Sequence, residues 1–364
     1  MKKQMPQFAA ILIFSIVCFN SCVSELQSSK TLDTGASGFE FTPNFSVEYL
    51  GNNVKLVTDA INRKLLLVPR GQDAPAGYED AMVVKTPVER ALFLATTQVG
   101  MVRPLGIWGS ITGIVSRPGT SGSMDKDVKE SGFGIEYISG IEQIISLNPD
   151  IMFIFTEHGP DLTARLEASG VPYAVNNEWR EKKHTDRMSW IKFLAAFFDK
   201  DEEAIKHLDS QMKKLKEMET LLAGAEKPKV AWGMISNGAA YVPGNDSYEA
   251  DQLRAAGCEY VFSHITGING VISVKEFYNT LNEADIWIYS SISNNVTDYA
   301  SLIELASSFA DVPSVVNKRV WLRHEDYFYF TDQSAEQVVE LAAIFHPDLY
   351  PDFKHFHYSA LESE

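Results

Sequence analysis

Short apolar segments alternate with helical patterns in two separate stretches of the chain, and this alternation most constrains the fold. Apolar runs of this length without polar alternation are typical of parallel strands that helices cover on both faces. The pattern therefore predicts an α/β fold with two lobes, over residues 81–184 and 227–364. The expected strands are 82–84, 111–115, 151–155 and 171–175 in the first lobe and 229–234, 286–289 and 319–322 in the second.

Helical patterns fill the intervals between these strands. In the first lobe the sequence predicts a helix from Pro87 to Val102, followed by helices over 140–147 and 162–168. In the second lobe it predicts helices over 248–256 and 274–281, and a closing helix and tail after the last strand. The order of elements is thus similar in the two halves.

The longest helical stretch separates the two lobes, over residues 185–226, and we expect it in two parts. Asp201 is a candidate N-cap for the second part. An apolar stripe runs from Ile205 through Leu208, Met212 and Leu215. At 1.5 Å per residue such a helix is about 30 Å long, which is enough to cross from one lobe to the other. We therefore predict a rigid interlobe helix.

A different rhythm precedes the first lobe. Residues 39–80 alternate between apolar and polar side chains around a Gly51-Asn52-Asn53 turn, which predicts a small antiparallel β-ribbon. We interpret it as an addition to the edge of the first lobe.

The N-terminus resembles a bacterial lipoprotein signal. Lys2 and Lys3 precede an apolar run over 8–19 that is too short to span a bilayer, and Cys22 follows at the expected cleavage point. We predict a signal peptide over 1–21, a diacylglycerol-modified Cys22, and a flexible tether over 22–38 rich in Ser, Thr, Gly and Asp. The mature protein would then be lipid-anchored on the periplasmic side of a membrane. The alternative is an ordinary signal cleaved nearby, which leaves Cys22 as a free thiol.

Composition excludes several classes of protein. The formal net charge is −16 and becomes two units more negative once Lys2 and Lys3 are removed, so nucleic acid is not an expected partner. If Cys18 leaves with the signal and Cys22 carries lipid, Cys258 is the only cysteine left and no intrachain disulfide can form. No dinucleotide-binding or phosphate-binding glycine motif, zinc-protease motif or nucleophile elbow is present. We therefore expect a protein that is not an enzyme and has no intrinsic cofactor.

The two halves share one further pattern, a glutamate on a helix followed nine or ten residues later by an apolar strand that an acidic residue precedes. Glu142 precedes Asp150 in the segment 140–150, and Glu276 precedes Asp285. Segment 140–150 closely resembles the signature of the substrate-binding proteins of ABC importers for cobalamin, iron-siderophores and haem, and the resemblance extends from about Met82 to the C-terminus.

That resemblance implies two Rossmann-like lobes joined by one rigid helix, with the ligand held between them. It also implies that Glu142 and Glu276 dock into arginines of a dimeric permease. The expected ligand is a bulky metal chelate, either a ferric siderophore, haem or a cobalamin, and the binding protein is expected to act as a monomer. Its contact with the membrane would be through the N-terminal lipid alone.

Ligands of α/β sheets bind beyond the carboxyl ends of the strands, so the loops after the strands supply the candidate cleft residues. Aromatic surface with a few polar anchors suits a large flat chelate. Tyr241 and Tyr327 match aromatic cleft residues of the cobalamin-binding relatives, whereas Glu136 and Gly270 depart from that pattern. Arg323 is a further candidate for pairing with ligand carboxylates. The candidates are Trp108, Glu136, Tyr137, Glu157, His158, Trp179 and Arg180 in the first lobe and Tyr241, Asp326, Tyr327 and Phe328 in the second.

Two other functions fit the sequence. The chain could bind a bare transition-metal ion such as zinc or manganese, as His355 and His357 suggest, although that pair lies in the C-terminal tail and no metal ligands are assigned. It could also be a surface lipoprotein that captures ligand for an outer-membrane receptor. The leaflet that holds Cys22 would decide between this last function and delivery to an importer.

Overall fold

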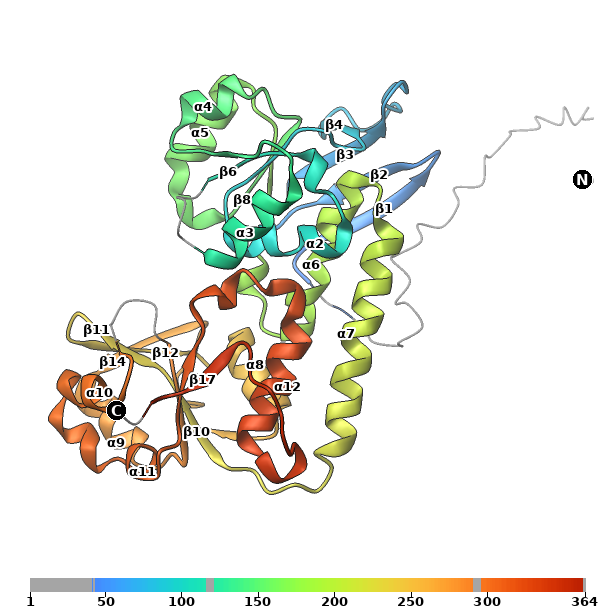
Figure 1. Ribbon diagram of the computed structural model, residues 1–364. Helices are drawn as coiled ribbons and strands as arrows, with labels where there is room; N and C mark the ends of the chain where they lie inside the picture. Colours follow the sequence, from blue (N-terminus) through green and yellow to red (C-terminus); the bar gives the residue numbers. More distant parts are fainter. Residues whose placement is uncertain (1–40, 42, 116–120, 291–295, 363–364) are drawn as a thin grey trace, which may run out of the picture.

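Two α/β lobes lie one above the other beside a long helix in the computed structural model (Figure 1). The structure describes residues 41, 43–115, 121–290 and 296–362. The predicted signal, the lipidation site Cys22 and the tether over 22–38 lie outside the described residues. Within these residues, no helix combines the length and apolar character needed to cross a bilayer.

The first lobe is built on a parallel sheet of five strands in the order β7-β6-β5-β8-β9. The predicted helix from Pro87 to Val102 is wrong over much of its length. The central strand β5 forms there instead and pairs with β6 on one side and β8 on the other. Only the end of the predicted helix is helical. The strands are β5 (Ala91–Phe93), β6 (Ile111–Ile114), β7 (Glu136–Tyr137), β8 (Ile151–Ile154) and β9 (Tyr173–Val175), and the helices are α1 (Thr96–Gly100), α2 (Val102–Leu105), α3 (Gly122–Ser131), α4 (Ile141–Ser146) and α5 (Gly159–Ser169).

The second lobe repeats this plan with the strand order β13-β10-β15-β16-β17, in which only β17 is antiparallel to its neighbour. The strands are β10 (Lys229–Trp232), β13 (Glu259–Tyr260), β15 (Ile286–Tyr289), β16 (Val320–Arg323) and β17 (Tyr358–Ala360), and the helices are α8 (Tyr248–Ala255), α9 (Val274–Leu281), α10 (Tyr299–Leu305), α11 (Pro313–Val316) and α12 (Ser334–Phe345).

The predicted strand 229–234 is divided at Gly233. The Gly233 carbonyl accepts a hydrogen bond from Trp287 Nε1 at 3.0 Å, and a side chain at this position would meet Phe277 and Val242 at 2.8 Å. Beyond Gly233 the chain enters a separate antiparallel sheet in the order β11-β12-β14. These strands are β11 (Met234–Ser236), β12 (Ala239–Pro243) and β14 (Asn269–Ser273).

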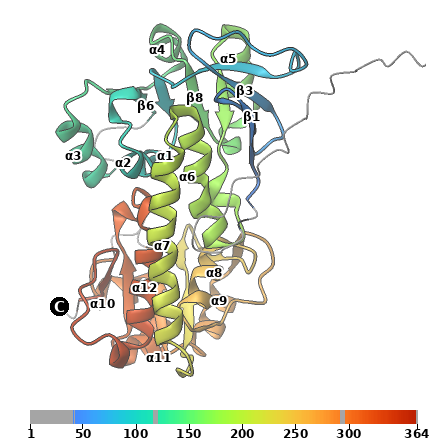
Figure 2. The ribbon, with the colours of Figure 1, turned by 90° about the vertical axis from the view of Figure 1, so that its right-hand side faces the viewer.

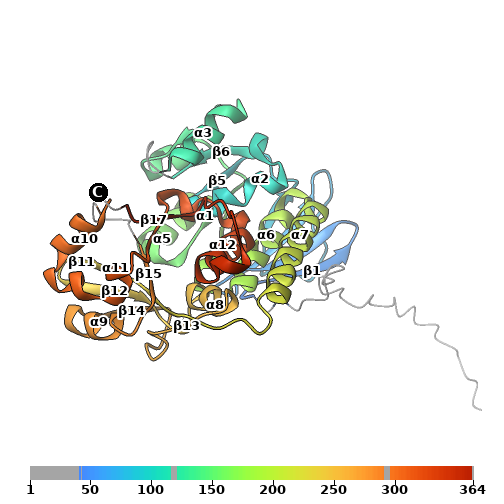
Figure 3. The same ribbon diagram turned by 60° about the horizontal axis from the view of Figure 1, so that its bottom comes forward.

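Two consecutive helices connect the lobes, α6 (His184–Phe198) and α7 (Asp201–Leu221). Figure 2 shows α7 running along both lobes, and Figure 3 shows α12 of the second lobe beside it. Asp201 does not cap α7 as predicted. The N-cap is Lys200, and the Asp201 carboxylate instead accepts hydrogen bonds from Lys55 Nζ and the Tyr49 hydroxyl, both at 2.7 Å.

The N-terminal addition is a sheet of four strands in the order β1-β2-β3-β4. The predicted lobe strand 82–84 belongs to it instead, because β4 pairs in parallel with β3. Phe45 stacks on Trp190 of α6, with ring centroids 4.7 Å apart, so the sheet packs against the interlobe helices. The strands are β1 (Ser46–Gly51), β2 (Val54–Thr58), β3 (Lys64–Pro69) and β4 (Met82–Thr86).

Lys55 ties this sheet to the start of α7. Its ammonium group is buried and lies 2.9 Å from Asp199 and 2.7 Å from Asp201. We expect Lys55→Met to lower the free energy of unfolding by about 2 kcal/mol, because the change leaves two half-buried carboxylates without their counter-charge. Urea denaturation would measure it. Lys64→Met is the matched control, since the Lys64–Asp80 pair is exposed and should contribute less than about 0.5 kcal/mol. Equal effects of the two changes would contradict the assignment.

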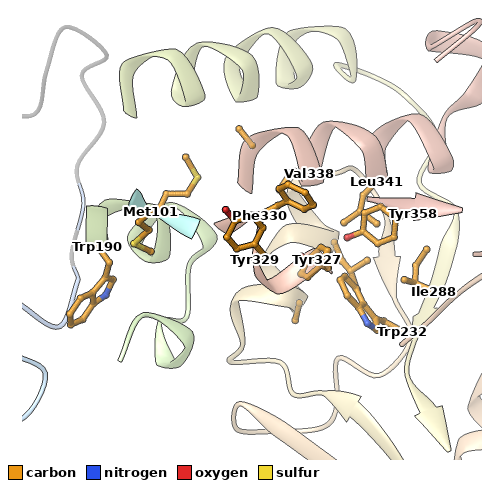
Figure 4. Packing of buried hydrophobic residues seen from close by; sticks show 14 of the residues in the cluster. Met101, Trp190, Trp232, Ile288, Tyr327, Tyr329, Phe330, Val338, Leu341 and Tyr358 are labelled. Atoms are coloured by element: carbon orange, nitrogen blue, oxygen red, sulfur yellow. The ribbon is translucent and has the colours of Figure 1, made fainter. Parts of the chain in front are cut away.

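One apolar core continues from the first lobe through the interlobe helices into the second. Figure 4 shows Trp190 of α6, Met101, Tyr329 and Trp232 along this path. The lobes come close together at Gly100, where a side chain would lie 2.0 Å from the Tyr329 carbonyl oxygen. The lobes are therefore joined by packed contacts as well as by the helices.

Candidate ligand cleft

Two cavities meet where the lobes face each other, and Phe328 lines both. We call them the junction cavity, of about 190 Å³, and the second-lobe cavity, of about 430 Å³. The junction cavity is lined by Ala95, Thr97, Gln98, Phe155, Asn176, Glu178, Trp179, Arg187, Tyr248 and Phe328. The second-lobe cavity is lined by Trp232, Met234, Tyr241, Val242, Pro243, Glu249, Asn269, Gly270, Val271, Ser290, Arg323 and Phe328.

The topology explains why these residues come together. In the first lobe the lining residues follow the carboxyl ends of β5, β8 and β9, which are neighbours in the sheet. In the second lobe Trp232 and Arg323 end β10 and β16, and Ser290 follows β15. Ligand sites of α/β proteins lie at these edges. The two cavities together are therefore the candidate ligand cleft.

Four of the predicted residues line this cleft: Trp179, Tyr241, Arg323 and Phe328. Tyr241 stands on β12 with 38% of its surface exposed. Phe328 ends the 3₁₀ turn η5 (Glu325–Phe328), and the buried guanidinium of Arg323 lies 4.4 Å from its ring centre. Aromatic faces from both lobes thus border one space.

Three predicted residues lie on the rim or close to it. Glu157 and Arg180 form an exposed ion pair at 2.9 Å, and the Arg180 guanidinium lies 5.3 Å from the centre of the Trp179 ring. His158 is in the 3₁₀ turn η2 (Thr156–His158) that follows β8. A pair this exposed contributes little to stability, so it is free to change partners when a ligand arrives.

Tyr327 was predicted to line the cleft but lies in the buried core instead. It is 1% exposed, and its hydroxyl donates a hydrogen bond to Gln252 Oε1 at 2.9 Å. Its ring belongs to the core between the second-lobe sheet and α12 (Figure 4). The neighbouring Phe328, one position along the same turn, is the residue that lines both cavities.

Asp326 likewise does not line the cleft, because its carboxylate is bound by Ser123. Its carboxylate accepts hydrogen bonds from the Ser123 backbone N–H at 3.0 Å and from the Ser123 hydroxyl at 2.5 Å. Burial alone would raise the pKa of Asp326, but these hydrogen bonds and one from Ser121 hold that pKa below its usual range. Because Ser123 belongs to α3 of the first lobe and Asp326 to the second lobe, these hydrogen bonds connect the two lobes.

The remaining candidates lie in the first lobe and line neither cavity. Trp108 is half-buried against the core in the turn η1 (Trp108–Ser110). Glu136 is exposed and accepts a hydrogen bond from Gln143 at 3.0 Å. The Tyr137 hydroxyl donates to Asp125, and burial together with that carboxylate raises the pKa of Tyr137.

The sequence did not indicate the polar floor of the junction cavity. Arg187 of α6 and Glu178 form an ion pair at 2.7 Å, with both side chains 2% exposed. The Arg187 guanidinium lies 4.1 Å from the centre of the Tyr248 ring, and burial raises the pKa of Tyr248 well above its usual value. Within the described residues, no three His, Cys, Asp or Glu side chains form a group suited to a metal ion.

Comparison with known proteins agrees with this architecture. Residues 93–327 match the family model described as periplasmic binding protein. A Methanocaldococcus jannaschii protein described as an uncharacterized lipoprotein is 24% identical, and the alignment covers 83% of this chain and 77% of that one.

Two solved structures share the fold. The Helicobacter pylori protein CeuE, in a structure with Ni(II) bound, is similar with a TM-score of 0.62 and 18% identity, over 78% of this chain and 92% of that one. A periplasmic heme binding protein from Pseudomonas aeruginosa is similar with a TM-score of 0.62 and 16% identity, over 76% of this chain and 99% of that one.

The family model covers well over half of the chain, including most of the first-lobe sheet, the interlobe helices and most of the second lobe. The resemblance inferred from segment 140–150 is thereby confirmed, and so is the expectation of a binding protein in place of an enzyme. The chain therefore belongs to the periplasmic binding protein family.

Proposed function

We propose that this protein captures a bulky metal chelate, such as a ferric siderophore, haem or a cobalamin, and delivers it to the permease of an ABC importer. The observation that carries the proposal is the aromatic cleft between the lobes, in which Trp179 and Phe328 line the junction cavity and Tyr241 and Phe328 line the second-lobe cavity. Large flat ligands are recognised by such surfaces with a few polar anchors.

The similar proteins support this class of ligand. One is a periplasmic heme binding protein, and another holds Ni(II). The relative from Methanocaldococcus jannaschii is described as a lipoprotein, which supports the proposal that Cys22 carries lipid and anchors the protein on the periplasmic side of the membrane. We propose that it acts there as a monomer, with the permease as its protein partner.

The lobes are proposed to move little during this cycle. The lobes are linked by the helices α6 and α7, by packing at Gly100 and by hydrogen bonds such as those between Asp326 and Ser123. A helix resists bending more than an extended linker does, so hinge opening is expected to be small.

Absorbance and calorimetric titration of the purified protein with haemin, ferric siderophores and cyanocobalamin would test the proposal. We expect one of these classes to bind, and we expect Tyr241→Ala to weaken that binding by about tenfold through loss of an aromatic contact. Phe356→Ala is the matched control, because Phe356 is also exposed but lines neither cavity of the cleft. Tight binding of free Zn²⁺ or Mn²⁺, with no chelate bound, would overturn the proposal.

A further inference from the structure

Four buried nitrogen atoms, all on residues that line the junction cavity, have no hydrogen-bond partner. They are Nη1 and Nη2 of Arg187, Nδ2 of Asn176 and Nε1 of Trp179. Arg187 is 2% exposed and Asn176 is 1% exposed. Buried polar groups are almost always satisfied, and all four of these atoms are donors. These four donors are therefore left without acceptors in the ligand-free structure.

The arrangement around Arg187 indicates the shape of the missing acceptor. Glu178 already accepts the hydrogen bond from Arg187 Nε at 2.7 Å, and the Tyr248 ring lies against the guanidinium. The two Nη atoms form the remaining edge of the planar group. Such an edge binds a carboxylate through two parallel hydrogen bonds.

The neighbouring donors extend this edge. Asn176 uses its Oδ1 to accept the Glu178 backbone N–H at 3.1 Å, which leaves its Nδ2 group for a ligand. Trp179 lies three residues further along the chain, and its Nε1 is the next free donor. A carboxylate has about four acceptor positions, so it can engage all of these donors at once.

The volume sets what can enter. At about 190 Å³ the junction cavity is smaller than a site for a whole drug-sized molecule, whereas the adjoining second-lobe cavity of about 430 Å³ is within that range. The smaller space suits one side arm of a ligand whose body occupies the larger one. Phe328 lines both spaces and so lies where the arm would join the body.

We propose that the junction cavity binds a carboxylate arm of the chelate, held by Arg187 with Asn176 and Trp179. This inference rests on the proposed function and narrows it to chelates that carry a free carboxylate. Glu178 balances the charge of Arg187, so the selectivity comes from hydrogen-bond geometry more than from net charge. The preference for a carboxylate should therefore persist at high salt, whereas attraction by exposed charges at the rim would be screened.

The test compares two ligands that differ only in the carboxylates, haemin and haemin dimethyl ester, by titration at low and high salt. A second comparison uses ferric citrate and a neutral ferric trihydroxamate. We expect the acid of at least one pair to bind at least about tenfold more tightly than its neutral counterpart, at both salt concentrations.

Asn176→Asp provides the matching variant. It keeps the oxygen that accepts the Glu178 N–H but replaces the free donor by a second oxygen, so we expect it to weaken binding of the acid by about tenfold and to leave the neutral ligand unchanged. The control is Asn177→Asp. Asn177 is a buried neighbour whose Nδ2 already donates to Thr156 Oγ1 at 3.1 Å and does not line the cavity.

Each outcome separates the two proposals. If acids and neutral chelates bind with equal affinity, or if the two asparagine variants behave alike, the carboxylate site is overturned while the chelate-binding function stands. If no chelate of either kind binds, the proposed function fails and the carboxylate site fails with it.

Discussion

Reversing the charges of Glu142 and Glu276 together should reduce transport by at least about tenfold and leave the affinity for the chelate unchanged. Both glutamates lie in the first turn of a helix, Glu142 on α4 and Glu276 on α9. Their side chains are 85% and 48% exposed, and neither lines the cleft. In Figure 1 both helices lie on the side of the molecule away from α7. One docking surface can therefore reach both lobes.

The expected size follows from the nature of the contact. The partners of these side chains are exposed: Arg165 lies 3.4 Å from Glu142 and His264 lies 3.9 Å from Glu276. Such pairs contribute little to folding, so the variants should remain stable. A charge pair desolvated in a complex contributes more, and replacing glutamate by arginine would add repulsion from the proposed arginines of the permease.

The measurement pairs uptake of labelled chelate by cells that carry the importer with titration of the purified variant. Glu202→Arg is the matched control, because Glu202 is also exposed in the first turn of a helix but lies on α7. Normal uptake by the Glu142→Arg, Glu276→Arg double variant would refute the docking assignment. A loss of chelate affinity in that variant would refute it as well, since the effect would then arise in the cleft.

The sequence predicted the elements whose signal is local. The strands at 111–115, 151–155 and 286–289 are continuous apolar runs, and the structure places β6, β8 and β15 there. In contrast, β5 was read as helix because Ala91–Phe93 is only three residues long and is followed by helix-forming residues. Its conformation is imposed by pairing with β6 and β8, which are distant in sequence.

The cleft residues also divide into those that a local signal predicts and those that depend on contacts distant in sequence. Trp179 and Tyr241 could be proposed from the rule that ligands bind beyond strand ends, and both line the cavities. Arg187 could not, because it lies inside α6, where a charged residue reads as part of a solvated helix face. Its burial depends on Glu178 and Tyr248, which come from different lobes. Tyr327 and Phe328 are adjacent in one turn, and their sequence alone does not distinguish the core residue from the cleft residue.

The largest effect on stability is expected from Glu178→Ala. This change leaves the Arg187 guanidinium buried without its counter-charge, and we expect the free energy of unfolding to fall by about 3–5 kcal/mol. Glu157→Ala is the matched control in the same cleft, because the Glu157–Arg180 pair is exposed and should cost less than about 1 kcal/mol. Chemical denaturation of the ligand-free protein measures both.

A double variant separates loss of the ion pair from loss of packing. Replacing both members by apolar residues, as Glu178→Leu with Arg187→Met, removes the uncompensated charge and should recover much of the stability that Glu178→Ala loses. The double variant should nevertheless bind acid chelates poorly, because it lacks the Arg187 donors while the aromatic walls remain. If the double variant were less stable than Glu178→Ala, packing in the floor of the cleft would outweigh the buried charge, contrary to this account.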